Sequence, residues 1–571
     1  MSRPDSPASR TGGLGGLSAY LDRRTLVMLG LGFGSGLPNL LIFDTLSAWL
    51  RDSGLSLKVI SIFSLATLAY SVKFLWAPLV DRLAIPGLTR WLGQRRAWMI
   101  ATQVLVLASL LLVAGGDPKA GLGRFALFAV LTGFAGATQD IVIDAWRIEA
   151  SEMSRQGAMA AAYQWGYRVA IIVAGALPLF LAEPIGWNLA YGLTAGLMAV
   201  AVAAALGAPR EERVQPRPIP TGGLPHQPAL EVGEWAARLA VLVFGGLLLG
   251  SALSADIGLI ASIIKAVGLA APAAALQAAW AVKGEGVWLQ LVAAIAGLAI
   301  IVAAACPLPR LRTRPGVYLS HALGDPMADF FQRFGGVAML ILALICVYRL
   351  SDFVLNIMTP FYLDLGFSKD QVAVVRKGFG VIMSMAGVFA GGLSVARLGV
   401  MRSMVIGAFA LPVTNTIFAW LATRGPDVGS LMTAIGVDNI VSGYAGTCLV
   451  AYMSSLTSAG FTITQYALFS SLYALPGKLL ASQSGRIVEA AAHAAQPGGP
   501  FAPLTSLFAH TPPTAFAQAM TKSQVAPAAL GAGYVAFFFY SGLVGVLSMV
   551  LAVLVARRTP RAVAIGEDEP A

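Results

Sequence analysis

Two aspartates stand one helical turn apart inside an otherwise apolar stretch, residues 135–146, which reads AGATQDIVIDAW. Asp140 and Asp144 are related as i and i+4, so a helix places both carboxylates on one face. A carboxyl group at membrane depth is costly, and it usually faces a bundle interior or a water-filled path. The pair therefore indicates a polar route through a membrane protein. The alternative interpretation is that such charges only pair with each other to hold helices together.

Other charged side chains also stand in apolar stretches. They are Lys73, Arg168, Arg349, Asp352, Lys377, Asp438 and Lys478. Arg349 and Asp352 are i, i+3 neighbours, so they can pair within one helix. The alternative is that Arg349 offers its forked donors to a substrate carboxylate while Asp352 exchanges protons.

The composition is that of a helical membrane protein. Of the 571 residues, 57% are hydrophobic and 12% are charged, and the mean hydropathy is +0.74. Long apolar runs without strand-like alternation favour helices over an outer-membrane barrel. The net charge of +11 comes from basic residues in short loops, so it reports membrane orientation rather than nucleic-acid binding. Cys306, Cys346 and Cys448 stand in apolar segments without CxxC spacing, which predicts small core residues.

The apolar runs predict fourteen membrane-spanning helices, in groups of six, two and six. Their ranges are 26–50, 59–80, 97–114, 125–146, 158–181, 189–206, 239–260, 287–305, 337–360, 372–396, 405–421, 431–456, 463–488 and 534–555. We therefore predict an all-α polytopic protein built from two six-helix bundles and an extra mid-chain helix pair. The expected parts are a tail (1–22), a first bundle (23–208), a linker with the extra pair (209–335), a second bundle (336–558) and a tail (559–571). We expect the extra pair to lie outside the bundles.

Basic residues gather in alternate loops. The clearest are Arg82, Arg90, Arg95 and Arg96 after the second span, Arg210, Arg213 and Arg217 after the sixth, and Arg397 and Arg402 after the tenth. The positive-inside rule places these loops and both termini in the cytoplasm. Residues 1–20 contain no apolar segment, so we expect no cleavable signal peptide.

The two six-helix sets share a pattern at one turn. Ala77 stands five positions before Arg82, and Gly392 stands five positions before Arg397, each time after the second span of its set. Repeated halves are typical of the major facilitator superfamily, whose substrate site lies between the halves near mid-membrane. We expect this turn to latch helix ends rather than contact substrate. The residues of this predicted cytoplasmic gate are Asp81, Arg82, Arg95, Arg96 and Arg397.

Cations, amides and aromatic residues from both sets predict a site for an anionic, hydroxyl-rich solute. The candidate substrate-binding residues are Tyr70, Lys73, Gln139, Tyr167, Arg168, Arg349, Asn356, Lys377, Asn439, Gln465 and Tyr466. The candidates for proton coupling are Asp140, Asp144, Asp352 and Asp438. For any single residue the alternative is a structural interhelical hydrogen bond.

Four glycines, Gly30, Gly32, Gly34 and Gly36, line one side of the first span, and Pro38 follows. Small residues let helices approach closely, and a proline loosens a helix, so this span is either closely packed or a bending element. The sequence contains no GxxxxGK[ST] or HExxH motif. We therefore expect no ATP-driven transport, no metal, no cofactor and no enzymatic activity.

Several strings resemble the AmpG muropeptide permeases of Gram-negative bacteria. They are GFGSGLP at 32–38, KFLWAPLVDR at 73–82, RRAW at 95–98, QDIV at 139–142 with DAW at 144–146, GYR at 166–168, Tyr348 with Asp352, and TQYAL at 464–468. Eukaryotic acetyl-CoA transporters are a more distant branch of the same clan. The mid-chain position of the extra pair and the long loop 491–527 depart from the enterobacterial pattern.

The resemblance implies a proton-coupled importer of the inner membrane that works by alternating access. Its substrates would be GlcNAc-anhydroMurNAc-peptides, carried from periplasm to cytoplasm for peptidoglycan recycling, a flux that also feeds beta-lactamase induction. We expect a monomer in the lipid bilayer, with no nucleic-acid partner. The alternatives are a facilitator for another anionic solute, such as an acyl-CoA, a peptide or a drug, and a membrane-embedded enzyme or non-transporting receptor. The lack of a clustered nucleophile, base or metal set argues against an enzyme.

Overall fold

The computed structural model shows a protein made of helices. It describes residues 21–54, 69–82, 84–118, 122–150, 153–209, 223–225, 227–254, 257–281, 285–307, 312–458, 460–481, 484–517 and 519–558. Every regular element in these ranges is helical. Eleven helices within them are long and apolar enough to cross a membrane. The predicted all-α polytopic fold is therefore confirmed.

The first six predicted spans form one half of the molecule. Its helices are α2 (Arg23–Leu40) and α3 (Leu46–Asp52), α5 (Ala69–Val72) and α6 (Ala77–Arg82), α8 (Gln94–Ala114), α9 (Leu122–Glu149), α10 (Met153–Ile185), and α11 (Trp187–Gly196) with α12 (Met198–Gly207). The short helix α7 (Leu88–Leu92) lies between α6 and α8. A π turn, Leu41–Thr45, joins α2 to α3 one turn after Pro38, where the missing proline N–H weakens regular helical bonding.

The last six predicted spans form the second half. Its helices are α19 (Ala338–Val347), α20 (Leu350–Val354) and α21 (Met358–Leu365), α22 (Lys369–Ala373) and α23 (Gly380–Leu398), α24 (Val400–Ala422), α25 (Val428–Ser455), α26 (Thr462–Ala481), and α29 (Pro527–Arg558). The loop predicted at 491–527 contains the end of α27 (Ser484–Ala494), a 3-10 helix (Ala502–Phe508) and α28 (Ala519–Ser523).

Three of the fourteen predicted spans are absent from the eleven long apolar helices. The π turn interrupts the first span, and the second begins in residues 55–68, outside the described part of the chain. The thirteenth coincides with α26, whose apolar residues alternate with polar ones such as Gln465. Apart from short breaks such as those at Trp76, Leu197 and Tyr348–Arg349, helical structure nevertheless occupies the described part of every predicted span.

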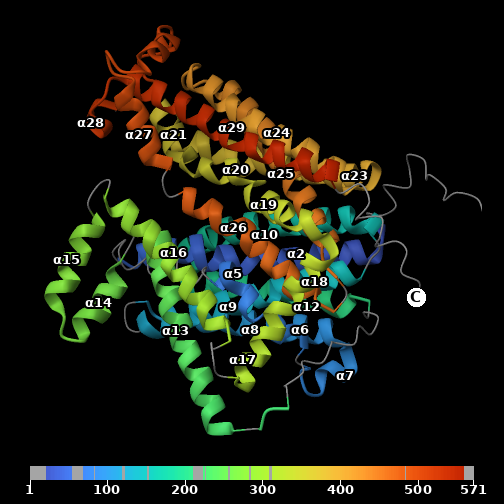
Figure 1. The fold of residues 1–571 in the computed structure, drawn as a ribbon. Helices are drawn as coiled ribbons and strands as arrows, with labels where there is room; N and C mark the ends of the chain where they lie inside the picture. The colour runs from blue at the N-terminus through green and yellow to red at the C-terminus, as the bar shows by residue number, and fades with distance from the viewer. Residues whose placement is uncertain are drawn as a thin grey trace, which may run out of the picture.

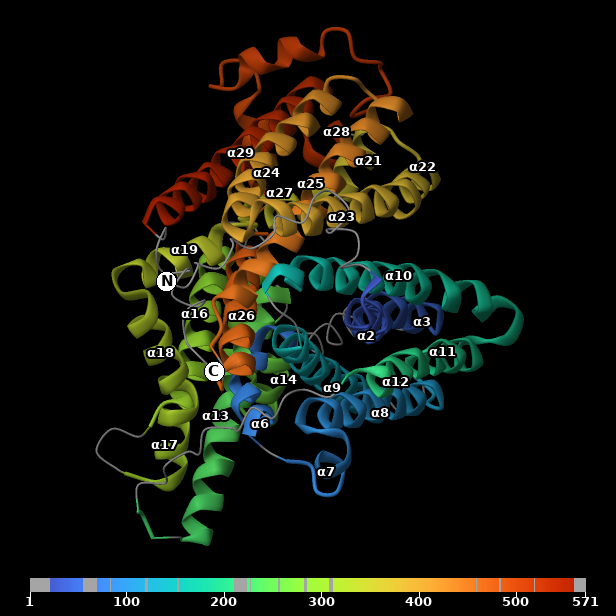
Figure 2. The same cartoon turned by 90° about the vertical axis from the view of Figure 1, so that its right-hand side faces the viewer.

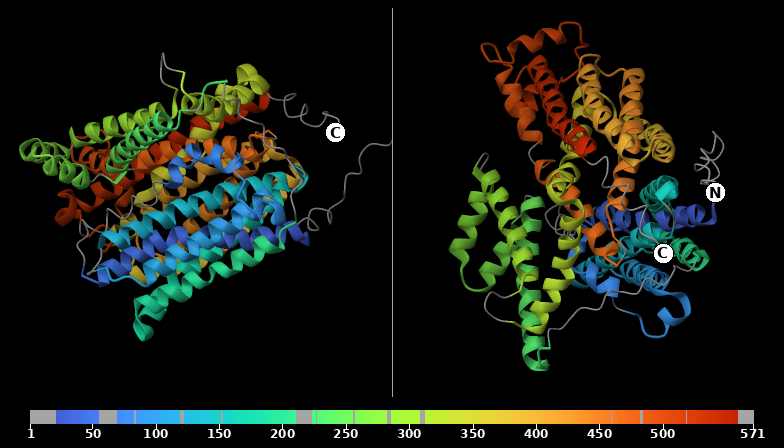
Figure 3. Two further views of the ribbon diagram at one scale, coloured as in Figure 1. Left: turned by 90° about the horizontal axis from the view of Figure 1, so that it is seen from below. Right: turned by 45° about the vertical axis from the view of Figure 1, so that its right-hand side comes forward.

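The two halves repeat one packing pattern. In the first half α2 packs on α10, α5 on α9, and α8 on α12; in the second, α19 and α20 pack on α26, α23 on α25, and α24 on α29. Each half thus joins its first helix to its fifth, its second to its fourth and its third to its sixth. The helices of both halves run in a common direction (Figure 3, left).

The repeated turn also has a repeated backbone conformation. Gly93 precedes α8 with φ 91° and ψ 168°, and Gly399 precedes α24 with φ 83° and ψ 164°. Only glycine adopts such a conformation without strain. We call this end of the molecule, which carries Arg95, Arg96 and Arg397, the basic end. The repeat expected from sequence is therefore visible in the chain path as well as in the packing.

The halves meet along a seam formed by two sets of contacts. On one side α10 packs against α23 and α25, and on the other α26 packs against α5, α6 and α9. Figure 2 shows α10 and α26 between the upper, orange and red helices and the blue ones. The second helix of each half thus packs on the fifth helix of the other, as a twofold-related pair of bundles requires.

The extra helices lie at the edge of the molecule (Figure 1). They are α13 (Pro228–Ser254) and α16 (Glu285–Ala305), which pack on each other, with the unpredicted hairpin α14 (Gly258–Ala266) and α15 (Ala270–Ala281) between them. In this view they lie to one side of the two bundles. The helices α17 (Arg314–Leu319) and α18 (Asp325–Phe334) then lead to α19.

Candidate functional site

Asp140 lies in a buried polar cluster that three helices of the first half share. Ser35 of α2 donates a hydrogen bond to Asp140 Oδ1 of α9, and its Oγ is 2.7 Å from Tyr163 Oη of α10. Ser35 is 0% exposed, Asp140 8% and Tyr163 9%. A polar group so buried must be hydrogen-bonded to avoid a large desolvation cost. This geometry supports the prediction that Asp140 faces the bundle interior rather than lipid.

Glycines explain how two of these three helices, α2 and α10, come close enough to build this cluster. A Cβ atom on Gly32 would lie 2.1 Å from the Tyr163 carbonyl oxygen, and one on Gly166 would lie 1.9 Å from the Leu29 carbonyl oxygen. The backbones of α2 and α10 therefore touch, as small residues permit in membrane helices. The expectation that the four glycines share one side of the helix is wrong, because Gly32 and Gly36 face α10 whereas Gly30 and Gly34 face α12. Both faces are close-packing surfaces, and the one on α10 brings Ser35 close to Tyr163.

Other predicted residues surround the cluster. Lys73, in a 3-10 turn, is buried and close enough to Asp140 to attract its carboxylate. Tyr167 accepts a hydrogen bond of 2.8 Å from Asn39. The hydroxyl of Tyr70 and the amide of Gln139 are buried without a hydrogen-bond partner in the described part of the chain. Unsatisfied polar atoms are costly in a static core, so this pattern suits a site that water or a ligand completes.

The second half carries its own polar cluster. Arg349 donates to Asp352 Oδ2 at 3.0 Å through Nε and at 2.5 Å through Nη2, and it also donates to Ser442 Oγ at 2.6 Å. Ser442 in turn donates to Asp352 Oδ2 at 3.2 Å. Asp352 Oδ1 has no partner among the described residues. Asp438 is partly buried and close enough to Asp352 and Arg349 to interact electrostatically.

Arg168 is the cation of the first half that faces this second cluster. It lies on α10 one turn after Trp165, whose indole donates to the Met385 carbonyl of α23 at 2.9 Å. Arg168 and Arg349 are close enough to repel each other across the seam. Arg168 is partly buried, and no hydrogen bond or ion pair of its guanidinium is found among the described residues. Two facing cations, one of them uncompensated, favour an anion between the halves.

Some predicted site residues do not join these clusters. Asn439 donates to the Ile435 carbonyl of its own helix at 2.9 Å. Gln465 is fully buried against α18: its amide donates to the Pro326 carbonyl at 2.8 Å and to Asp329 at 3.0 Å. Gln465 therefore contributes to helix docking here. The side chains of Asn356, Lys377 and Lys478 lie outside what the structure describes.

Asp144 belongs to a contact that crosses the seam toward the basic end. It accepts a hydrogen bond from Arg147 at 3.2 Å. Arg147, 0% exposed, also donates to Ser454 of α25 at 2.8 Å and to Gln156 at 3.3 Å, and its guanidinium lies 5.3 Å from the ring centre of Tyr466 on α26. Sequence reasoning missed Arg147, although its position three residues after Asp144 in a continuing helix was a usable signal.

At the basic end, Arg95 joins three helices of the first half. It donates to Asp81 of α6 at 2.8 Å and to Glu149 of α9 at 2.7 and 2.9 Å, and all three residues are nearly buried. Arg96 donates to the Leu206 carbonyl at the end of α12 at 2.7 Å. These contacts hold helix ends together, as expected, but within one half. Arg397 is exposed, and the Arg82 side chain lies outside what the structure describes.

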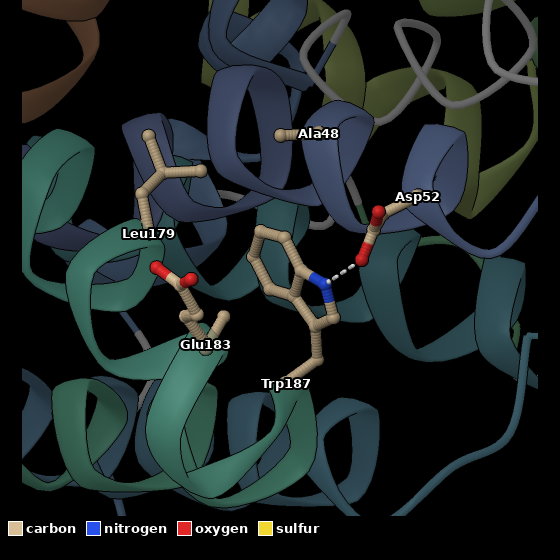
Figure 4. Close-up of a pocket in the computed structure, with 6 residues that line it drawn as sticks. Ala48, Asp52, Leu179, Glu183 and Trp187 are labelled. Carbon is tan, nitrogen blue, oxygen red and sulfur yellow. Dashed lines mark hydrogen bonds between the residues drawn. The ribbon is translucent and has the colours of Figure 1, made fainter.

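A pocket of about 630 Å³ lies elsewhere, between α3, α10 and α11 (Figure 4). Trp187 stands in it between Asp52 and Glu183 and donates to Asp52 Oδ2 at 2.7 Å. Its charged lining is acidic, so it disfavours an anion, and we place the candidate site at the seam instead. Within the described residues, no group of three histidine, cysteine or acidic side chains could hold a metal ion.

Known proteins are similar in sequence to parts of this chain or to most of it. The family model described as acetyl-coenzyme A transporter 1 matches residues 25–117. Putative transporter AmpG 4 of Rickettsia felis is 28% identical over 472 residues, which cover 82% of this chain and 91% of that protein. The anhydromuropeptide permease of Escherichia coli K12 is 29% identical over 477 residues, which cover 83% of this chain and 76% of the relative. The expected resemblance to the AmpG permeases is thus confirmed.

Two solved structures also align with the chain. The human organic anion transporter MFSD10 covers 93% of it at 14% identity, and the proton:xylose symporter XylE covers 97% at 11% identity, each with a TM-score of 0.47. The sequence relatives named above are transporters and a permease. They place this chain among multi-pass membrane transporters rather than enzymes.

Proposed function

We propose that this chain is a proton-coupled importer of the major-facilitator kind that carries anhydromuropeptides across the bacterial inner membrane. The observation that carries the proposal is the approach, across the seam, of Arg168 on α10 to the Arg349–Asp352 cluster of the other half. The buried Asp140 cluster is also bonded to α10, through Ser35 and Tyr163. The name of the E. coli relative supports the substrate. Import would supply peptidoglycan recycling and feed beta-lactamase induction.

The proposed mechanism is alternating access about the seam. The basic end faces the cytoplasm by the positive-inside rule, with both termini on that side, and the transporter acts as a monomer. Arg168 and Arg349 bind the anionic groups of the substrate, while the tyrosines and amides of the seam bind its sugar hydroxyls. Proton uptake by Asp140, Asp144, Asp352 or Asp438 changes the charge pairing, so loaded and empty carriers prefer different conformations.

Proteoliposome uptake under an imposed pH gradient tests the coupling. Asp140→Asn, Asp144→Asn and Asp352→Asn each mimic the protonated carboxyl without loss of bulk. At the coupling residue the change should abolish gradient-driven accumulation of labelled anhydromuropeptide yet preserve exchange between inside and outside. Asp427→Asn, at the exposed start of α25, is the control and should transport normally. Wild-type accumulation by all three buried variants would refute the role of these carboxylates.

A second candidate substrate is an acyl-CoA, which also presents several negative charges. The match of residues 25–117 to the acetyl-coenzyme A transporter model favours this candidate. Competition distinguishes the two substrates in the same proteoliposomes. Uptake of labelled anhydromuropeptide should not be blocked by excess acetyl-CoA, and labelled acetyl-CoA should not accumulate. Uptake of labelled acetyl-CoA, with none of labelled anhydromuropeptide, would favour the acyl-CoA.

A further inference from the structure

Ser35 connects the buried carboxylate Asp140 to the helix that forms the seam. Its hydroxyl lies between Asp140 of α9 and Tyr163 of α10, and all three side chains are buried. Among the described residues, Ser35 is the group that donates a hydrogen bond to the Asp140 carboxylate. We infer that Ser35 is a positioning residue that transmits the protonation state of Asp140 to α10, an inference that rests on the proposed proton-coupled function.

The donors and acceptors of Asp140, Ser35 and Tyr163 allow two arrangements of hydrogen bonds. A serine hydroxyl has one hydrogen and two lone pairs. When Asp140 is ionised, Ser35 donates to the carboxylate, so the contact with Tyr163 requires the tyrosine to donate. When Asp140 takes a proton from solution, its new O–H donates to Ser35 Oγ. The Ser35 hydrogen then turns to Tyr163 Oη, and the Tyr163 hydrogen must find another acceptor.

This reversal would reach the seam because Tyr163 lies on α10 near residues that contact the other half. Trp165, two positions later, donates to the Met385 carbonyl of α23 at 2.9 Å. Arg168 lies a further turn along and faces Arg349. The backbones of α2 and α10 touch at Gly32 and Gly166, so Ser35 and Tyr163 have little room to relax locally. A change in their hydrogen bond therefore acts on the packed pair of helices, and α10 carries it to the seam.

The other ionisable groups near Asp140 come from five elements. They are Lys73 before α6, Asp144 on the same helix α9, Tyr70 on α5, Tyr163 and Tyr167 on α10, and Tyr466 on α26. Lys73 supplies a compensating charge to Asp140. Ser35 differs from all of these groups because it contacts the carboxylate and α10 at once.

The experiment compares Ser35→Ala, Asp140→Asn and the double variant in proteoliposomes. Two signals are measured for labelled anhydromuropeptide: accumulation driven by a pH gradient, and gradient-free exchange. We expect Ser35→Ala to lower accumulation about tenfold or more, the size of one charge-assisted hydrogen bond, with exchange retained within about twofold. Since both residues act in one step, the double variant should lose no more accumulation than Asp140→Asn alone.

Two further variants make the test specific. Tyr163→Phe removes the other end of the chain and should reproduce the Ser35→Ala pattern. Ser541→Ala is the matched control, because this serine of α29 is also 0% exposed but, among the described residues, donates only to the Phe538 carbonyl of its own helix, at 2.8 Å. It should leave both signals unchanged.

The outcomes separate this inference from the proposed function. If Asp140→Asn keeps gradient-driven accumulation, proton coupling at Asp140 is wrong, and the inference falls with it. If Asp140→Asn loses accumulation while Ser35→Ala keeps it, only the role of Ser35 is overturned. Loss of exchange together with accumulation in Ser35→Ala would also overturn it, because that pattern indicates a structural residue.

Discussion

At the scale of residues, the two arginines that face each other across the seam have different surroundings. Arg349 is neutralised by Asp352 and bonded to Ser442, whereas no hydrogen bond or ion pair of Arg168 is found among the described residues. We expect Arg168→Gln to weaken binding of an anionic substrate about tenfold or more and to leave the folded yield unchanged. Arg349→Gln should instead lower stability, because it leaves Asp352 buried without its cation.

Equilibrium binding and thermal unfolding in detergent measure these two effects. Removal of one partner from a buried ion pair costs on the order of 3 kcal/mol. The Arg349–Asp352 pair is partly buried, so Arg349→Gln should cost less than this and still lower the unfolding temperature. The Arg349→Gln/Asp352→Asn pair restores neutrality and should recover part of it. Unchanged substrate affinity in well-folded Arg168→Gln would contradict the assignment of Arg168.

Single residues could be predicted where the sequence places a charge in an apolar run. Asp140 and the Arg349–Asp352 pair were found in this way, and the structure places them near the seam. Gln465 was chosen for its chemistry, yet its amide is bound by α18, a partner more than a hundred residues away. Arg147 and Glu149 were missed because they stand near a helix end, where a charged residue is usually solvated. For Arg147 the i, i+3 spacing from Asp144 was the signal that could have found it.

At the scale of elements, the contact between α2 and α10 holds the Asp140 cluster in place. A methyl group on Gly166 would meet the Leu29 carbonyl, so Gly166→Ala must separate the helices and stretch the Ser35–Tyr163 bond. We expect a loss of about 1–3 kcal/mol, the usual cost of overpacking, together with impaired proton coupling. The change is measured by thermal unfolding and by gradient-driven uptake.

Gly192→Ala on α11 is the matched control for that substitution. Its new methyl group would lie 3.7 Å from the Ala114 side chain, an ordinary contact. Alanine also favours a helix over glycine by about 1 kcal/mol, so this variant should be as stable as the wild type or slightly more stable. An equal loss in both variants would mean that general helix perturbation, rather than the α2–α10 contact, is responsible.

Elements were largely predictable, because a long apolar run in a membrane protein has few alternatives to a helix. The hairpin of α14 and α15 was not predicted, since its helices of 9 and 12 residues are shorter than a membrane span. The pairing of helices across the seam was not predictable from hydropathy, which does not tell which apolar face meets which. The turn that is repeated at Arg82 and Arg397 predicted that the two halves are related, but it did not predict which helices contact each other.

At the scale of the whole molecule, Arg147 joins the halves toward the basic end. It connects α9 to Ser454 of α25 and to the ring of Tyr466 on α26, so this conformation is held closed there. Opening the basic end must break these contacts, which makes Arg147 a latch between the halves. We expect Arg147→Gln to raise the population open at the basic end about tenfold or more.

Spin labels report this opening as a distance between the halves. Trp91 of α7 in the first half is 81% exposed, and Leu398 at the end of α23 in the second is 45% exposed. Both lie at the basic end, so cysteines there, with the three native cysteines replaced by serine, can be labelled. Arg147→Gln should add a longer-distance population to the distribution.

Arg95→Gln is the control that distinguishes loss of the Arg147 latch from general loosening of the protein. Arg95, like Arg147, is a buried arginine that binds carboxylates. Its partners Asp81 and Glu149, however, belong to its own half. Its loss should lower stability and leave the distance between the halves unchanged in the protein that remains folded. If instead Arg95→Gln and Arg147→Gln lengthened the distance equally, closure at the basic end would depend on the rigidity of the first half, and Arg147 would not be the latch.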